Sequence, residues 1–317
     1  MPENGVELVA LNKTYRGDGR QPPKVALRDV GLAIPRGSFF GLLGPNGAGK
    51  STLINILAGL VIKTSGSARI WGHDIDTDMR AARCAIGVVP QETNIDPFFT
   101  PRQLLELQAG LYGVPKPERR TWEILEAVGL TAQAEAYART LSGGMRRRLL
   151  IGKAMIHAPL VLVLDEPTAG VDLELRRRLW TYMKDMNAAG TTILLTTHYL
   201  EEAEKLCERI AIINHGRVVA CDTTGALLRR VDEKELVVTV ADDLSVVPAA
   251  LRRFDAELLP PRRLFFRYRT RETQIGEIIT ALQDEGLIIA DLSTEESNLE
   301  DIFLQLTRAT PESEEAG

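Results

Sequence analysis

Aromatic residues, cysteines and long apolar runs are all scarce in this sequence of 317 residues. Aromatic side chains make up 5% of it, and its 3 cysteines lie far apart without a C-x-x-C pair. A disulfide framework and a cysteine zinc site are therefore not indicated, and a reducing compartment fits. The longest apolar stretch, from Leu53 to Ile62, is about half of the roughly 18 to 20 residues that a membrane-spanning helix needs. The chain is expected to depend on another protein for any place at a membrane.

Strong basic character is missing as well. The formal net charge is -5, whereas sequence-independent nucleic-acid binding usually needs a strongly basic face. Nucleic acid is therefore not an expected partner. The first residues include Glu3 and Glu7 and contain no apolar core, so a signal peptide is not expected.

The length is about twice that of a typical single domain, and the pattern of the chain changes near residue 235. Leu236, Val238 and Val240 alternate with more polar neighbours, which is typical of a strand. The pattern predicts a β-α-β-β-α-β-α order, in which residues 246–254 form the first helix. We expect one large domain over residues 1–232 and a small α+β domain over residues 233–308. The tail, residues 309–317, is rich in Pro, Glu and Ser and is expected to be disordered.

A glycine-rich loop stands between a predicted strand, Phe39–Leu43, and a predicted helix. Residues 44–51 read GPNGAGKS and satisfy the pattern G-x-x-x-x-G-K-[ST] in the context that this motif requires. Backbone N–H groups of such a loop approach phosphates, Lys50 places a charge on the β and γ phosphates, and Ser51 can ligate Mg²⁺. The sequence therefore predicts a nucleoside-triphosphate site.

Two acids follow the uninterrupted apolar run Leu160–Leu164, which is typical of a strand that is covered on both faces. Asp165 can hold Mg²⁺, and Glu166 is placed to polarise the water that attacks the γ-phosphorus. A capping serine and two glycines, residues 142–144, expose N–H groups at a predicted helix start and form a second anion site. Together these motifs predict a nucleoside triphosphatase.

In this order the motifs resemble those of the ATP-binding cassette (ABC) family over about residues 5 to 230. The resemblance implies an α/β P-loop cassette with a mixed sheet and a helical subdomain. It makes residues 141–145 the ABC signature, Gln91 the Q-loop glutamine, residues 169–172 the D-loop and His198 the switch histidine. Tyr15 would stack on adenine, although a tyrosine that packs at a strand end is the alternative.

The resemblance, together with the motifs, assigns site residues. The catalytic residues are Glu166, His198 and Gln91, and the metal ligands are Ser51, Gln91 and Asp165. ATP would contact Tyr15, Gly44, Pro45, Asn46, Gly47, Ala48, Gly49, Lys50, Ser51, Thr52, Ser142, Gly143 and Gly144.

Two features near the signature depart from the pattern of the family. Met145 occupies the fifth signature position, where glutamine is commoner, and its side chain offers no comparable polar contact. The basic run Arg146–Arg148 could touch phosphates, but such a run on a helix is more typical of a solvated face.

In the family two cassettes face head to tail, so the resemblance implies a homodimer and a separate integral membrane permease subunit. The C-terminal extension resembles those on type-2 exporters, which implies an ATPase that powers export from the cytoplasmic face of the membrane. The permease would contact the segment after Gln91, where Phe98 and Phe99 precede a helix that a capping box opens at Thr100; alternatively both rings fold inward. The other functional class is a soluble ABC ATPase with a non-transport partner, which the single compact cassette disfavours. The transported substrate is not encoded in these motifs.

Overall fold

The computed structural model contains two compact units, Met1–Thr224 and Gly225–Gly317. This division lies a few residues before the expected boundary at 232. Among the described residues no helix is long and apolar enough to cross a membrane. The structure describes residues 2–17, 22–92, 94–168, 171, 173–229, 233–269, 272–296 and 299–308.

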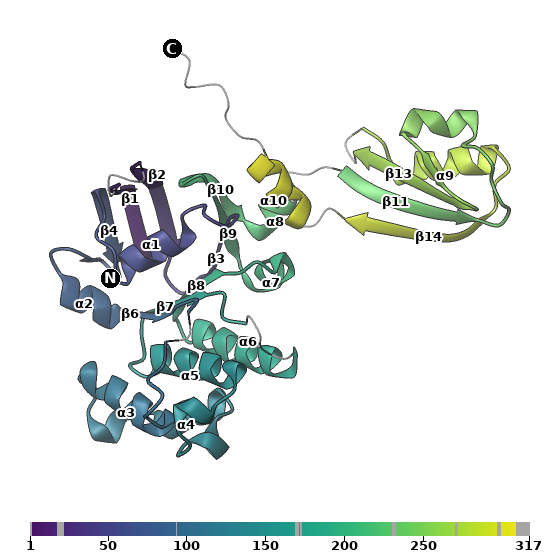
Figure 1. The fold of residues 1–317 in the computed structure, drawn as a ribbon. Helices are drawn as coiled ribbons and strands as arrows, with labels where there is room; N and C mark the ends of the chain where they lie inside the picture. The colour runs from purple at the N-terminus through teal and green to yellow at the C-terminus, as the bar shows by residue number, and fades with distance from the viewer. Residues whose placement is uncertain are drawn as a thin grey trace, which may run out of the picture. The chain divides into compact units, whose positions relative to one another are not determined.

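A six-stranded mixed sheet forms the centre of the first unit (Figure 1). The strand order is β10-β9-β3-β8-β7-β6, and every pairing is parallel except that of β9 with β10. Every residue of β3, β7 and β8 is buried, which explains why these strands are continuous apolar runs. The bounds are β3 Phe39–Leu43, β6 Ile86–Val89, β7 Val161–Asp165, β8 Thr192–Thr196, β9 Arg209–Asn214 and β10 Arg217–Thr223.

A second, antiparallel sheet has the order β2-β1-β4-β5. Its first two strands have 12 residues each and pair along most of their length. Leu27, Ile56 and Val163 belong to one hydrophobic cluster, so both sheets share a core with the first helix. The bounds are β1 Asn4–Tyr15, β2 Lys24–Pro35, β4 Ser65–Ile70 and β5 His73–Asp74.

The helices between β6 and β7 form a helical part of this unit, and Figure 1 shows α3, α4 and α5 on one side of the six-stranded sheet, away from β1 and β2. The predicted capping box at Thr100 is confirmed, since its hydroxyl accepts from Gln103 N at 3.3 Å and Gln103 Oε1 accepts from Thr100 N at 3.0 Å. The α-helices are α1 Lys50–Leu57, α2 Met79–Ala85, α3 Pro101–Leu111, α4 Thr121–Ala127, α5 Gly143–Met155, α6 Leu173–Ala188, α7 Leu200–Leu206 and α8 Thr224–Leu228, and the 3₁₀ helices are η1 Lys116–Glu118, η2 Thr131–Gln133 and η3 Ala138–Thr140.

The second unit contains an antiparallel sheet of order β12-β13-β11-β14 with its own hydrophobic cluster. Its element order agrees with the predicted β-α-β-β-α-β-α pattern, but the helix expected over residues 246–254 is a 3₁₀ helix that begins after Pro248. Proline disfavours helical backbone at the residue before it, which shortens this element. The predicted tail lies outside the described residues. The bounds are β11 Glu233–Val240, η4 Ala249–Phe254, β12 Glu257–Leu259, β13 Arg263–Arg269, α9 Ile275–Asp284, β14 Ile289–Glu296 and α10 Leu299–Arg308.

Candidate active site

The glycine-rich loop joins β3 to α1, as its motif predicts. Gly47 and Gly49 have φ values of +82° and +114°, in the region that favours glycine. A side chain on Gly44 would lie 2.3 Å from the carbonyl oxygen of Ile213 on β9, so the loop packs directly on the neighbouring strand. Lys50 Nζ donates to the Gly44 and Pro45 carbonyl oxygens at 2.5 and 3.2 Å, which keeps the ammonium within the loop.

A cavity of about 440 Å³ opens beside this loop. It brings the loop together with Gln91 and both acids after β7, although these segments lie far apart in the sequence. Gly44, Pro45 and His198 are not among its lining residues, and neither are the signature residues. The lining residues are Tyr15, Lys24, Ala26, Asn46, Gly47, Ala48, Gly49, Lys50, Ser51, Thr52, Gln91, Asp165 and Glu166.

Asp165 is the last residue of β7 and is 5% exposed. Its Oδ1 accepts a hydrogen bond from the Thr196 hydroxyl at 2.5 Å. Burial raises the pKa of Asp165, against the opposing effects of that hydrogen bond, Lys50 and Arg147. A bound cation would offset the cost of this buried carboxylate.

The oxygen atoms around the cavity suit Mg²⁺. A serine hydroxyl, a carboxylate and an amide oxygen are hard ligands, and Mg²⁺ is commonly held by few protein ligands together with phosphate oxygens. Ser51, Asp165 and Gln91 supply these groups. The described residues contain no group of three or more His, Cys, Asp or Glu side chains that could hold a metal ion by themselves.

Glu166 has a strained backbone, with φ at +50°. Its N–H donates to the Thr196 carbonyl oxygen at 3.1 Å, which holds this conformation. Oε2 accepts from Gln91 Nε2 at 3.3 Å and lies 3.5 Å from His198 Nδ1. Strained residues concentrate at functional sites, and this one places its carboxylate between the two other predicted catalytic side chains.

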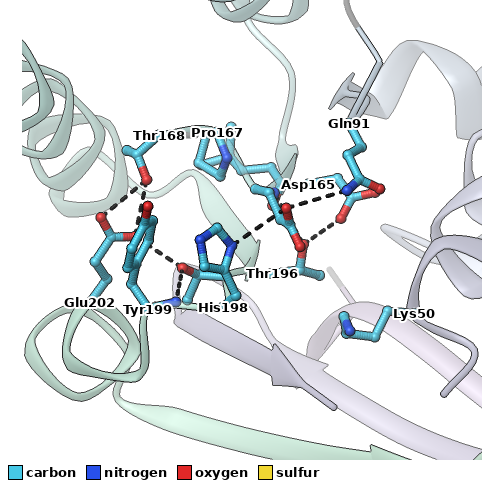
Figure 2. Close-up of polar contacts among 12 residues, drawn as sticks. Lys50, Gln91, Asp165, Pro167, Thr168, Thr196, His198, Tyr199 and Glu202 are labelled. Atoms are coloured by element: carbon cyan, nitrogen blue, oxygen red, sulfur yellow. Dashed lines mark hydrogen bonds and ion pairs between the residues drawn. The ribbon is translucent and has the colours of Figure 1, made fainter. Parts of the chain in front are cut away.

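His198 follows β8 and is half exposed. Figure 2 shows His198, Gln91 and Thr196 directed toward the end of β7 next to Asp165. The imidazole stacks at a tilt on Tyr199, with 3.9 Å between ring centroids. Tyr199 N in turn donates to the Thr197 hydroxyl at 2.9 Å. His198, the predicted switch histidine, therefore contacts the cavity-lining residue Glu166 without lining the cavity itself.

A buried carboxylate behind His198 was not predicted. Glu202 on α7 accepts from the hydroxyls of Thr168 at 3.1 Å and Thr197 at 3.1 Å (Figure 2). These two threonines follow β7 and β8, so Glu202 ties together the segments that carry Glu166 and His198. Only the tertiary contact identifies it, because its sequence position reads as an ordinary solvated residue in an acidic helix.

Tyr15 lines the cavity at the end of β1 and is 38% exposed. Its hydroxyl lies 3.4 Å from the Thr52 hydroxyl, and Lys13 Nζ sits 4.7 Å from the ring centroid. One ring face is thus covered by a cation. The stacking of Tyr15 on adenine stays a prediction.

The signature residues lie at the start of α5, as predicted. The Ser142 side chain accepts from Met145 N at 3.2 Å, and Ser142 and Gly143 are exposed. The residues of the predicted second anion site are therefore exposed and do not line the cavity of the same copy. Of the predicted D-loop, Val171 is buried, and Ala169, Gly170 and Asp172 lie outside the described residues.

The solvated-face interpretation of Arg146–Arg148 is wrong for its central residue. Arg147 is 4% exposed and donates to main-chain carbonyls near the site. Arg148 donates to the Val128 and Gly129 carbonyl oxygens at 2.8 and 2.6 Å. The spacing along the helix indicates this burial, because Arg147 lies three and four residues before the buried Leu150 and Ile151 and so shares their face.

Comparisons with known proteins identify the family of this chain. The family model described as ABC transporter matches residues 27–169. The chain is 39% identical to a daunorubicin resistance ATP-binding protein of Streptomyces coeruleorubidus, over 98% of this chain and 97% of that protein. It is 36% identical to the Nod factor export ATP-binding protein I of Paraburkholderia xenovorans, over 97% of this chain and 98% of that protein. A dimeric ATP-binding cassette solved in a post-hydrolysis state with ADP and Pi is 28% identical, with a TM-score of 0.62 over 69% of this chain and 98% of that one.

Proposed function

Since the chain belongs to the ABC transporter family and is a transport-coupled ATPase, we propose that two copies close head to tail around two ATP molecules and drive a separate membrane subunit. One observation carries this proposal. The cavity gathers the phosphate loop, Asp165, Glu166 and Gln91, whereas the signature stands outside it at an exposed helix start. One copy therefore presents two incomplete halves of a site, and a second copy supplies the missing half to each.

The cavity residues divide the chemistry among them. The loop N–H groups and Lys50 bind phosphate, and Mg²⁺ held by Ser51, Asp165 and Gln91 would neutralise phosphate charge. Glu166 accepts the proton of the attacking water, and its contacts with Gln91 and His198 hold the carboxylate in place.

Complementation between two inactive variants tests the head-to-tail arrangement. Lys50→Ala removes the phosphate cation, and Ser142→Arg blocks the signature. In a mixed dimer one site combines the intact loop of the Ser142→Arg copy with the intact signature of the Lys50→Ala copy. An equal mixture should recover up to about a quarter of wild-type phosphate release, because about half of the dimers are mixed and each holds one complete site.

Each variant alone serves as the control and should release little phosphate. Full activity of Ser142→Arg by itself would show that the signature takes no part in hydrolysis. Two inactive variants that regain no activity when mixed would contradict the proposed arrangement.

A groove of about 280 Å³ is the surface that we propose the membrane subunit contacts. Its basic members are Arg83, Lys153 and His157, and no acid is among the described residues that line it. Burial lowers the pKa of Lys153, and no carboxylate offsets this effect. Leu60 at the rim is 75% exposed. An amphipathic segment that carries a carboxylate would complement both the charge and the apolar surface.

Phe98, four residues after the groove residue Asn94, also supports this segment as a contact surface, since its side chain is 69% exposed rather than folded inward. Phe99 is 36% exposed. The integral membrane permease would thus hold the chain at the cytoplasmic face of the membrane. The names of the relatives above, daunorubicin resistance and Nod factor export, favour export, and they give no support to a soluble ATPase with a non-transport partner.

Charge reversal tests the groove. Lys153→Glu should reduce the fraction of tagged chain that stays on washed membranes of the producing organism, because it would repel an acidic partner segment. Lys184→Glu changes the same charge at an exposed position on α6 and should stay bound like wild type. Equal retention of both variants would exclude the groove as the docking site.

The proposed division into a cassette, residues 1–232, and an accessory domain, residues 233–308, draws support from the cores. The hydrophobic cluster described above for the first unit runs from Val6 to Cys221 in the sequence. That of the second unit runs from Leu236 to Ile289. Truncation near residue 232 should leave a folded cassette that binds ATP. Loss of binding would show that the boundary is wrong.

A further inference from the structure

Arg147 is a buried cation on α5 that donates to main-chain carbonyls on two separate segments. Nη1 donates to the carbonyl oxygens of Pro90 and Gln91, which follow β6, at 2.5 and 2.8 Å. Burial lowers the pKa of the Arg147 guanidinium, while Asp165 and Glu166 oppose this effect. Arginine nevertheless keeps its proton in proteins, so a full positive charge lies next to the main chain of Gln91, Asp165 and Glu166.

The second segment follows β7. Nη2 donates to the carbonyl oxygens of Asp165 and Glu166, the latter at 2.6 Å, and Nε donates to that of Pro167 at 3.4 Å. A guanidinium has five N–H donors in one rigid plane, and Arg147 has five carbonyl partners. Lysine has three donors on a single atom and no planar fork, so it cannot reproduce this geometry.

The two segments that Arg147 joins carry two of the proposed catalytic side chains. Gln91 Nε2 and Glu166 Oε2 are 3.3 Å apart, and this contact depends on the relative position of their backbones. Arg147 fixes that position through its hydrogen bonds to main-chain oxygens of both segments.

The same helix reaches two other surfaces of the cassette. α5 begins next to Ser142, and Leu150 and Lys153 line the groove described above. Pro90, whose carbonyl accepts from Arg147, lines that groove as well. A segment that enters the groove therefore contacts both the helix that carries Arg147 and Pro90, the residue whose carbonyl oxygen Arg147 binds.

We propose that Arg147 is a positioning residue that locks the backbones of Gln91 and Glu166 to α5, so that an occupant of the groove moves both catalytic side chains together. The inference rests on the proposed roles of Gln91 and Glu166. It adds a connection between the groove and the Glu166 carboxylate. This connection consists of the Arg147 side chain and its five main-chain acceptors.

Arg147→Lys and Arg147→Gln test this link in the full chain. Arg148→Lys is the matched control, because Arg148 is the next residue on the same helix and also donates to carbonyls, but to those of Val128 and Gly129. A small misplacement of catalytic groups can cost about 10²-fold in rate. We expect both Arg147 variants to lose about 10- to 100-fold in kcat, with the Kd for ATP within about twofold of wild type. Arg148→Lys should keep its kcat.

Amide hydrogen exchange supplies a readout that general destabilisation would not reproduce. In Arg147→Lys the peptides that cover residues 86–96 and 161–168 should exchange faster together, while the peptide around residues 125–130 is unchanged. Arg148→Lys should show the reverse pattern.

The outcomes separate this inference from the proposed function. Glu166→Gln should slow hydrolysis by about 10² to 10⁴-fold whatever Arg147 does, so near wild-type hydrolysis by Glu166→Gln would overturn the proposed general-base role on which this inference rests. If Glu166→Gln is slow but the Arg147 variants keep wild-type kcat and exchange, the positioning role is refuted. A loss of kcat accompanied by an equal loss of ATP binding and a lowered Tm would also refute it, because Arg147 would then serve the fold alone. Arg147→Gln keeps two donors and provides the same comparison if Arg147→Lys does not fold.

Discussion

Replacement of Glu166 by glutamine isolates the proposed proton transfer. The amide keeps the size of the side chain and can still accept from Gln91, which lies 3.3 Å away. It cannot accept the proton of the attacking water. A positioned general base contributes about 10² to 10⁴-fold, which is about 2.7 to 5.4 kcal/mol of activation free energy. We therefore expect phosphate release to fall by that factor while ATP binding survives.

The substitution should also change the dimer. It removes one negative charge near the γ-phosphate of each of the two proposed sites, so closure of the two copies meets less repulsion. Glu166→Gln should accumulate as an ATP-bound dimer in size-exclusion chromatography with ATP and Mg²⁺. Glu201→Gln removes a charge from an exposed side chain that pairs with Lys205 at 3.2 Å on α7 and should behave like wild type.

Phosphate release from Glu166→Gln at a near wild-type rate would refute the general-base role. Slow release without dimerisation would leave the base role intact and show that closure also requires the membrane subunit.

Two further predictions concern stability. Gly44→Ala should lower the free energy of unfolding by about 1 to 3 kcal/mol, because its Cβ would meet Ile213 O at 2.3 Å. Gly47→Ala has open space around its Cβ and should cost only the roughly 1 to 2 kcal/mol of its positive φ. A larger loss for Gly47→Ala than for Gly44→Ala in urea denaturation would contradict this. Burial lowers the pKa of His157, against its hydrogen bond to Ile86 O, so the folded chain binds fewer protons than the unfolded chain as the pH falls below about 6.5. The stability is then highest above that pH and declines toward the lower folded pKa. His157→Gln should reduce the difference in Tm between pH 7.5 and 5.5, and an unchanged difference would exclude this contribution.

The parts of the site that the sequence predicts well are those whose determinants are local. The phosphate loop needs glycines, Lys50 and a strand-to-helix context, and all of these lie within a few residues of each other. The acids after β7 follow a buried apolar run for the same reason, and Thr100 and Ser142 cap their own helices. Local chemistry of this kind can be identified before any tertiary contact is known.

The parts that the sequence predicts poorly depend on contacts between distant segments. Arg147 looks like one member of a solvated basic run until α5 is packed against the ends of β6 and β7. The Thr196 hydroxyl on Asp165 and the Glu202 carboxylate on two threonines have the same character. Short elements are predicted poorly for a different reason, since Pro248 shortens the helix that was expected over residues 246–254.

The partners of Arg147 have a consequence for how this cassette tolerates variation. All five acceptors are main-chain oxygens, and substitution of a side chain leaves a main-chain oxygen in place. Residues 90, 91 and 165–167 can therefore change in identity without removing an acceptor, provided that their backbone path is kept. The single position at which a side-chain substitution deletes this connection is Arg147 itself, whereas the identities of Gln91, Asp165 and Glu166 are constrained by their own proposed roles in the cavity.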